Sequence, residues 1–192
     1  MIAVVELADN IHHGAQHHLM GASRDIFMPL ADILKSMAIR EDDVMADVGA
    51  GDGYYAALFS KRCSKVYAIE VDKSAAALIK AKKLNGVVVL NMDICQGWPL
   101  DDVTYAFFSN SFHDLDCKEK LIAEMSKRLV KPARIAMIEF KQDTPFGPPA
   151  SIRLSTDELD KLMRRGEFHL MGRQDFRFHY LSVYSRMPIT PM

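Results

Sequence analysis

The chain has 192 residues and a formal net charge of −1 at pH 7, with 49% hydrophobic and 26% charged residues. This length is most simply one domain that buries a proper core, and the composition is ordinary for a globular protein. Because basic and acidic residues are interspersed, we expect no broad electrostatic footprint for DNA or RNA and no nucleic-acid partner. No apolar run approaches the length of a membrane span and no basic-then-apolar signal opens the chain, so we predict no membrane partner.

The number and spacing of the cysteines indicate the redox state of the compartment in which the protein works. Cys63, Cys95 and Cys117 are odd in number, widely separated and in no metal-ligand spacing. We therefore predict three reduced thiols in a cytoplasmic protein.

The first 22 residues form a polar leader that we expect to fold over the ligand pocket. Four of the seven histidines lie there, at His12, His13, His17 and His18. If the segment is helical, His13 and His17 share one face at a spacing that suits a metal. No carboxylate or cysteine completes a ligand set nearby, so we predict no metal.

The chain is organised around one glycine-rich stretch, residues 44–53. Val44 to Val48 is a short apolar run that predicts a buried strand, and Gly49, Gly51 and Gly53 then interrupt it before a helix over 54–61. A dinucleotide fingerprint needs a third glycine where Tyr54 stands, and no Gly-Lys-Ser/Thr follows, which excludes a P-loop. A glycine turn after a strand still lets the backbone approach a ligand closely.

The elements around this stretch alternate between helix and strand. An amphipathic helix over 23–38, capped by Ser23, precedes it, and Pro29 indicates a kink or a late start. Strands are expected at 65–69, 86–90, 103–108 and 133–140, and helices at 73–84 and 117–129. We expect the strand at 86–90 to be buried, because it is continuous and β-branched. The order predicts an α/β fold with a Rossmann-like, doubly wound, mostly parallel sheet.

The C-terminal part is expected to complete the same domain. Ser155 and Glu158 have the capping-box spacing for a helix that ends near Gly166. Strands at 168–172 and 178–185 would form an antiparallel pair. We predict one domain over 23–186 and a loose tail over 187–192.

Acidic residues follow two of the strands. Glu70 lies at the tip of the second strand, roughly 20 residues beyond the glycine turn, where an acid accepts hydrogen bonds from ribose hydroxyls. Asp93 follows the third strand and, taken alone, could simply cap a turn. The loop at 109–115 follows the fourth strand, where open α/β sheets place their ligand chemistry.

Together these motifs resemble the class I S-adenosylmethionine-dependent methyltransferases, and most closely the small branch that contains the ubiquinone and menaquinone biosynthesis enzymes. The resemblance runs from about Met28 to Arg186 and includes the segments at 112–115 and 147–149. The family commonly has two glycines where Ala133 and Arg134 stand here. No large insertion provides a substrate cap, so the acceptor pocket is expected to come from residues 1–22, 110–115 and 143–153.

The resemblance implies S-adenosyl-L-methionine as cofactor and S-adenosyl-L-homocysteine as product. It assigns Asp93 to the adenine amino group and the backbone of Ile94 to the ring. The full set of cofactor-binding residues that we predict is Asp47, Gly49, Ala50, Gly51, Gly53, Glu70, Val71, Asp93, Ile94 and Asn110.

His113 is the candidate catalytic base, because its loop should lie beside the transferred methyl group. It could equally be a wall of the pocket or a donor to the cofactor. Asp114 could orient it or cap the next helix, and we favour capping. We expect Arg153 to be solvated, although it could pair with an anionic substrate, and we assign no role to His169 or His179.

The predicted function is methyl transfer to a small-molecule acceptor by in-line displacement. A cofactor-binding module without turnover is the alternative, and a macromolecular acceptor is less favoured because residues 109–112 are not the Pro-Pro-Tyr type motif. Tyr54 disfavours a nicotinamide oxidoreductase. Both a monomer and a homodimer fit the sequence.

Overall fold

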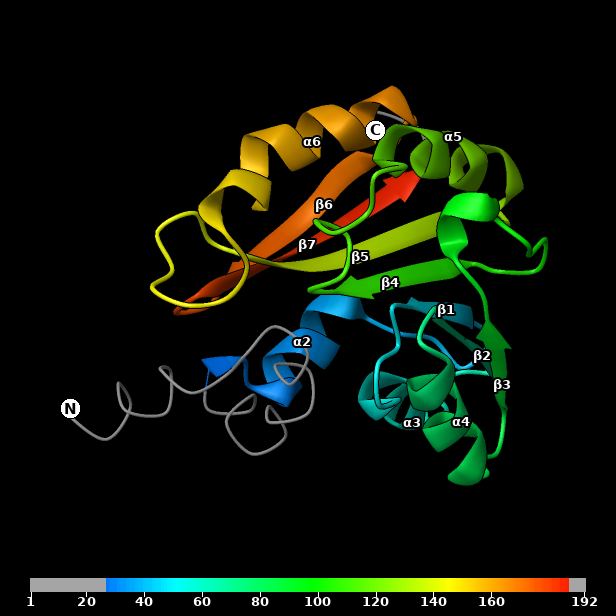
Figure 1. Ribbon diagram of the computed structural model, residues 1–192. Coiled ribbons are helices and arrows are strands. Elements are labelled where there is room, and N and C mark those ends of the chain that lie inside the picture. The colour runs from blue at the N-terminus through cyan, green and yellow to red at the C-terminus, as the bar shows by residue number, and fades with distance from the viewer. Residues whose placement is uncertain (1–26, 187–192) are drawn as a thin grey trace.

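The computed structural model describes residues 27–186, which fold around one sheet with helices on both faces (Figure 1). The leader at 1–22 with its four histidines, the cap at Ser23 and the tail at 187–192 lie outside the described residues. The domain bounds that we predicted therefore stay a prediction.

The sheet in the described part of the chain has seven strands in the order β3-β2-β1-β4-β5-β7-β6. The strands are β1 (Val44–Val48), β2 (Lys65–Glu70), β3 (Val87–Asn91), β4 (Tyr105–Ser109), β5 (Ala133–Phe140), β6 (His169–Asp175) and β7 (His179–Arg186). The first five are parallel, and β7 pairs antiparallel with both β5 and β6. The strand order reverses between β1 and β4, and open α/β sheets place their ligand site at the carboxyl ends of the strands at such a point. The predicted sheet is confirmed.

Each face of the sheet carries its own hydrophobic core. The helices are α2 (Leu30–Met37), α3 (Tyr54–Phe59), α4 (Lys73–Ala81), α5 (Lys118–Arg128) and α6 (Thr156–Arg165), with short 3-10 turns η1 (Ile94–Gln96) and η2 (Ala150–Ile152). Helices α5 and α6 cover one face, and α2, α3 and α4 cover the other (Figure 1). Alternate residues of β1 supply the two cores, Met45 on the α3 side and Ala46 on the α5 side, because successive strand side chains point to opposite faces.

Most of the predicted element boundaries are confirmed. Asp72 caps α4 by accepting from the Ala75 N–H at 2.7 Å, and Ser155 and Glu158 form the expected capping box. Helix α2 takes the late start, at Leu30 after Pro29, because proline fits the boundary better than the interior of a helix. Strand β3 is not buried as expected, since it is the sheet edge and every residue in it keeps some exposure.

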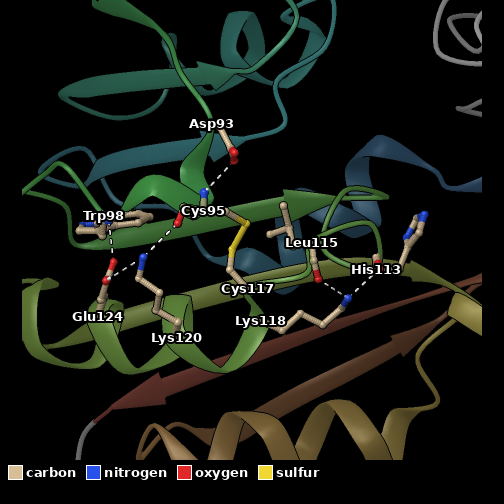
Figure 2. Close-up of a disulfide and its surroundings, with 9 residues drawn as sticks. All are labelled: Asp93, Cys95, Trp98, His113, Leu115, Cys117, Lys118, Lys120 and Glu124. Atoms are coloured by element: carbon tan, nitrogen blue, oxygen red, sulfur yellow. Dashed lines mark hydrogen bonds and ion pairs between the residues drawn. A yellow bond between two sulfur atoms is a disulfide. The ribbon is translucent and has the colours of Figure 1, made fainter.

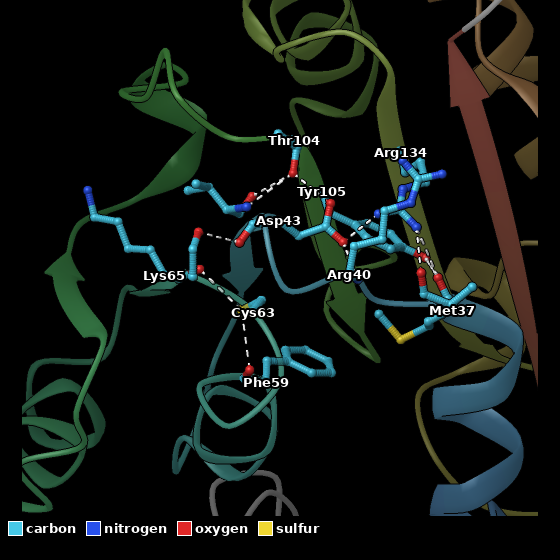
Figure 3. Close-up of polar contacts among 12 residues, drawn as sticks. Met37, Arg40, Asp43, Phe59, Cys63, Lys65, Thr104, Tyr105 and Arg134 are labelled. Carbon is cyan, nitrogen blue, oxygen red and sulfur yellow. Dashed lines mark hydrogen bonds and ion pairs between the residues drawn. The ribbon is translucent and has the colours of Figure 1, made fainter.

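The amino ends of the central strands are closed by a cluster of polar side chains around Asp43 (Figure 3). The Asp43 carboxylate is 4% exposed, accepts hydrogen bonds from the Arg40 N–H and the Thr104 hydroxyl, and pairs with Arg134. The Tyr105 hydroxyl donates to the Met37 carbonyl at 3.1 Å, and the Arg134 guanidinium lies over the Tyr105 ring. Every one of these polar groups has a partner, which is the pattern of a structural cluster.

The cysteine prediction is wrong for two of the three residues. Cys95 and Cys117 form a disulfide, and only Cys63 is a free thiol. Their separation of 22 residues gave no sign of pairing, because it is the fold that brings η1 against the start of α5. Within residues 27–186, no helix has the length and apolar character that crossing a membrane requires.

Candidate active site

The glycine turn after β1 follows the strand as its sequence predicted, and its three glycines adopt left-handed backbone angles. Gly49, Gly51 and Gly53 have φ angles of +74°, +55° and +78°, which side chains other than glycine rarely adopt. A Cβ on Gly49 would lie 2.5 Å from the Ser111 Cβ, so the loop after β4 packs directly against this turn. A Cβ on Gly51 would meet nothing within 4 Å. The turn therefore presents its backbone to open space at Gly51.

Glu70 fixes the conformation of this turn. Its carboxylate is 8% exposed and accepts from the Gly51 N–H at 2.7 Å and from the Asp72 N–H at 2.8 Å. Each oxygen makes one of these bonds, which leaves further lone pairs to accept from a ligand. The acid predicted to bind ribose is thus held at the end of β2 beside the glycine turn.

A cavity of about 70 Å³ lies at the carboxyl ends of β1, β2 and β3. Its lining includes four of the predicted residues, Gly49, Val71, Asp93 and Ile94. The other lining residues are Val48, Ile69, Met92, Ser111 and Leu115. Of these, Ser111 and Leu115 come from the loop after β4, so two separate parts of the chain close around the cavity.

Asp93 has the capping role that its position allows. Its carboxylate accepts from the Cys95 N–H at 2.8 Å and so begins the 3-10 turn η1. Because only one oxygen is used, the carboxylate can still accept from an amino group in the cavity. Ile94 is buried and lines the same cavity.

Asn110 is a strained residue at the end of β4. Its φ angle is +53°, and its N–H donates to the Ile138 carbonyl at 2.8 Å. Its side-chain oxygen Oδ1 is buried and has no hydrogen-bond partner among the described residues. A buried amide oxygen without a partner is costly, and a ligand that donates to it would remove that cost.

Three further predicted cofactor residues, Asp47, Ala50 and Gly53, are not among the residues that line the cavity. Asp47 is buried in β1 two residues before Gly49, Ala50 is buried within the glycine turn, and Gly53 is the N-cap of α3. A Cβ on Gly53 would lie 2.9 Å from the Ile79 side chain, so this glycine serves the packing of α3 against α4.

A buried polar pair at this end of the sheet is formed by His113 and Glu139. His113 Nδ1 lies 2.6 Å from Glu139 Oε2, and both side chains are almost fully buried. The other carboxylate oxygen accepts from the N–H groups of Phe112 and His113 at 3.1 and 3.2 Å. Glu139 therefore fixes both the histidine ring and the backbone of the loop that carries it.

These contacts set the protonation of His113. Burial lowers the pKa of the ring, but the hydrogen bond to Glu139, its negative charge and that of Asp114 together raise the pKa above its usual value. With Nδ1–H donated to Glu139, the Nε2 atom is the one that gains and loses a proton. Sequence reasoning missed Glu139, although an acid inside the apolar strand at 133–140 was a signal for it.

Two expectations for nearby side chains are corrected. Asp114 does not cap α5, whose N-cap is Cys117 without a side-chain cap, and its Oδ1 lies 3.4 Å from His113 Nε2. Arg153 is not solvated, because it is 9% exposed and donates to the carbonyls of Lys141, Gln142, Thr144, Phe146 and Pro148. It organises the loop after β5.

The two remaining histidines differ from each other. His169 is exposed on β6. His179 is 1% exposed, its ring lies 4.2 Å from that of Phe140, and neither ring nitrogen has a hydrogen-bond partner among residues 27–186. Burial lowers its pKa to about 4, so it is neutral at physiological pH.

Comparison with known proteins agrees with this geometry. A family model described as a methyltransferase domain matches residues 46–137, which run from the glycine strand through β5. The chain is also similar to the crystal structure of an S-adenosylmethionine-dependent methyltransferase from Aquifex aeolicus. That structure has a TM-score of 0.76 and 25% identity, and the match covers 96% of this chain and 97% of the other. Residues 46–137 therefore match a methyltransferase domain, and the described sheet has the arrangement of the class I methyltransferase fold.

Curated relatives match a smaller part of the chain. One is a protein-L-isoaspartate O-methyltransferase from Maricaulis maris, 32% identical over 38% of this chain and 38% of its own length. Another is an rRNA adenine N-6-methyltransferase from Limosilactobacillus reuteri, 28% identical over 48% of this chain and 40% of its own. The chain spans about two fifths of the length of these relatives, and their acceptors differ from each other.

The residues present fit S-adenosylmethionine. The open backbone at Gly51, the carboxylates of Glu70 and Asp93 with free lone pairs, and the unpartnered Oδ1 of Asn110 offer acceptors and close backbone approach. A ligand with a carboxylate, an ammonium, ribose hydroxyls and an adenine amino group can use all of them.

Proposed function

We propose that this chain transfers the methyl group of S-adenosylmethionine to a small-molecule acceptor, and that His113 takes the proton which the acceptor loses. The observation that carries this proposal is the buried pair of His113 and Glu139, 2.6 Å apart, on the loop that borders the cavity. A buried histidine whose protonation is controlled by a carboxylate is suited to general base catalysis.

The protein's part in the reaction is positioning and proton transfer. When bound, the cofactor supplies an electrophilic methyl group on a sulfonium. Glu70, Asp93 and the glycine turn would hold it in place, and the loop at 110–115 would present the acceptor. Glu139 keeps the proton of His113 on Nδ1, which leaves Nε2 to accept a proton from the acceptor. The positive charge that then forms on the ring is stabilised by the Glu139 carboxylate.

The acceptor is proposed to be small for reasons within the chain. The net charge is −1 and no broad basic surface is expected from the sequence. Arg153, with its five carbonyl partners, holds together the loop after β5, which the sequence predicts as one side of the acceptor pocket. We keep the ubiquinone and menaquinone biosynthesis branch as the source of candidate acceptors.

Two further predictions stay open to experiment. We propose that the protein works in the cytoplasm, although the cysteine argument for this no longer holds for Cys95 and Cys117. We also propose a monomer or a homodimer, which light scattering would distinguish.

The test is an acceptor screen with a matched pair of histidine variants. Wild type is assayed with S-adenosylmethionine against hydroxyl, amine, thiol and activated-carbon acceptors, first for turnover and then for kcat. With the acceptor found, His113→Asn is expected to lower kcat by about 100-fold, while binding of S-adenosylhomocysteine measured by calorimetry stays within about twofold. His169→Asn, which alters an exposed histidine on β6, should leave both unchanged.

Two outcomes would contradict the proposal. Binding of the cofactor without turnover on any acceptor would favour the alternative, a binding module. Turnover on a protein or RNA alone would reject the small-molecule acceptor while leaving the enzyme class intact.

A further inference from the structure

The disulfide joins two segments that are far apart in the sequence. Cys95 lies in η1, and Cys117 is the N-cap of α5, 22 residues later, with the two Cα atoms 5.5 Å apart. Figure 2 shows the bridge spanning the space between the turn after Asp93 and the loop that contains His113 and Leu115. It is the covalent link between the two sides of the cofactor cavity.

Both bridged segments line the cavity next to the cysteines. Asp93 and Ile94 directly precede Cys95, and Leu115 lies two residues before Cys117. The Asp93 carboxylate also accepts from the Cys95 N–H at 2.8 Å. A change at the sulfur atoms therefore reaches the side chains that face the ligand within one or two residues.

The other contacts across this junction are weaker than the bridge. The ammonium group of the exposed Lys120 donates a hydrogen bond to the Cys95 carbonyl at 3.0 Å, and the Glu124 carboxylate accepts one from the Trp98 N–H at 2.7 Å. Contacts that depend on an exposed lysine contribute little to stability. Ile94 and Trp98 also share a hydrophobic core with Leu121 and Met125 of α5, and the Arg128 guanidinium donates to the Trp98 carbonyl. The bridge is the covalent member of this junction and the one that lies next to the cavity.

The surroundings of the two sulfur atoms permit thiol–disulfide exchange. Cys95 and Cys117 are both partly exposed, so a small thiol can reach them. Cys117 is the N-cap of the eleven-residue helix α5 and makes no side-chain capping bond, so opening the bridge costs the helix no cap.

We propose that Cys95 and Cys117 form a reversible redox site that sets the affinity for the cofactor, with the disulfide form binding more tightly. In the reducing direction, a dithiol attacks one sulfur as its thiolate, forms a mixed disulfide and then closes its own ring. Two electrons and two protons pass from the dithiol to Cys95 and Cys117. Once the bridge is open, the segments at 93–96 and 113–117 must be ordered when the ligand binds, and that ordering reduces affinity.

The test measures cofactor binding in each redox state, and it does not depend on the acceptor. Cys63→Ser is used as background, because serine can donate to the same carbonyls of Phe59 and Lys65 and the bridge then holds the only other cysteines in the sequence. S-adenosylhomocysteine is titrated by calorimetry into the oxidised protein and into protein reduced with dithiothreitol. We expect reduction to weaken binding by about threefold to tenfold and reoxidation to restore it.

Two controls make the outcome decisive. Alkylation followed by mass spectrometry should find no free thiol before reduction and two after it. The further change Cys95→Ser with Cys117→Ser should bind like the reduced protein and ignore dithiothreitol. Equal or tighter binding after reduction, or two thiols that stay alkylatable under oxidising conditions, would overturn the proposal. Absence of methyl transfer alone would not, since it would count only against the proposed function.

Discussion

The two ends of the central strands are built on opposite principles. At the amino end, Asp43, Thr104 and Arg134 bind one another across three elements (Figure 3). At the carboxyl end, glycines with positive φ angles follow β1, and Asn110 is strained with a buried oxygen that lacks a partner among the described residues. The first end is satisfied by the protein itself, whereas the second keeps polar groups that a ligand can bind.

This difference indicates where the fold tolerates unfavourable backbone angles and unpaired buried polar groups. Strain and unpaired buried groups persist in a fold only when the surrounding structure holds them, and they gather at functional sites. His113 and Glu139 lie at the carboxyl end but resemble the amino end, because their side chains are hydrogen-bonded to each other. Changes at the amino end should therefore alter stability alone, and changes at the carboxyl end should alter binding or turnover.

The largest effect is expected from Asp43→Ala. It leaves the Arg134 guanidinium, whose side chain is 12% exposed, without its carboxylate. Loss of one partner of a buried ion pair should lower the free energy of unfolding by about 3–5 kcal/mol. Urea denaturation measures this, and calorimetry on the folded variant should give the wild-type affinity for S-adenosylhomocysteine. A large loss of affinity in well-folded protein would mean that the two ends are coupled.

The next effect separates two glycines in the same turn. Gly49→Ala combines a positive φ angle with a Cβ only 2.5 Å from Ser111, and we expect a loss of about 3 kcal/mol in stability. Gly51→Ala carries the backbone strain without the clash, so its loss should be about 1–2 kcal/mol. Its methyl group points into the open space, however, so it should abolish cofactor binding. Wild-type affinity in Gly51→Ala would show that the ligand does not lie over this glycine.

The fold was predictable from the sequence to a large extent, and the site only in part. The glycine turn and the strand-end position of Glu70 were predictable because they depend on local spacing along the chain, and Asp93 came from the family resemblance. That these two acids bind the cofactor stays a prediction. Glu139, Ser111 and the cysteine pair were missed because their roles depend on contacts between distant segments, such as the 26 residues that separate Glu139 from His113. The edge position of β3 was missed for the same reason, since apolar β-branched residues do not reveal whether a strand has one neighbour or two.

Glu70→Ala tests the cofactor side of the comparison. It removes the acceptor for the Gly51 N–H and the contact predicted for ribose, so the dissociation constant for S-adenosylhomocysteine should rise about tenfold. At saturating cofactor, kcat should stay near the wild-type value, because His113 and Glu139 are untouched. Glu70→Gln, which keeps one oxygen acceptor, should show a smaller loss. An unchanged affinity in Glu70→Ala would remove this residue from the cofactor site.

The smallest effect concerns the two buried histidines, whose pKa values are shifted in opposite directions. His179 has its pKa lowered to about 4 by burial, from a usual value of 6.5. Below pH 6.5 the unfolded chain therefore binds a proton that the folded protein refuses, and stability falls as the pH drops toward 4. Between pH 6.5 and 5.5 this lowers the free energy of unfolding by about 1 kcal/mol.

His113 has the opposite effect on stability, because its raised pKa gives stability that is present at acidic pH and lost as the pH rises through that value. Urea denaturation at the two pH values should thus show a loss in wild type that His179→Phe lacks, while His113→Asn should lose more stability than wild type over the same interval. Equal pH dependence in wild type and His179→Phe would show that His179 accepts a proton in the folded protein, and the buried ring beside Phe140 would then need a partner.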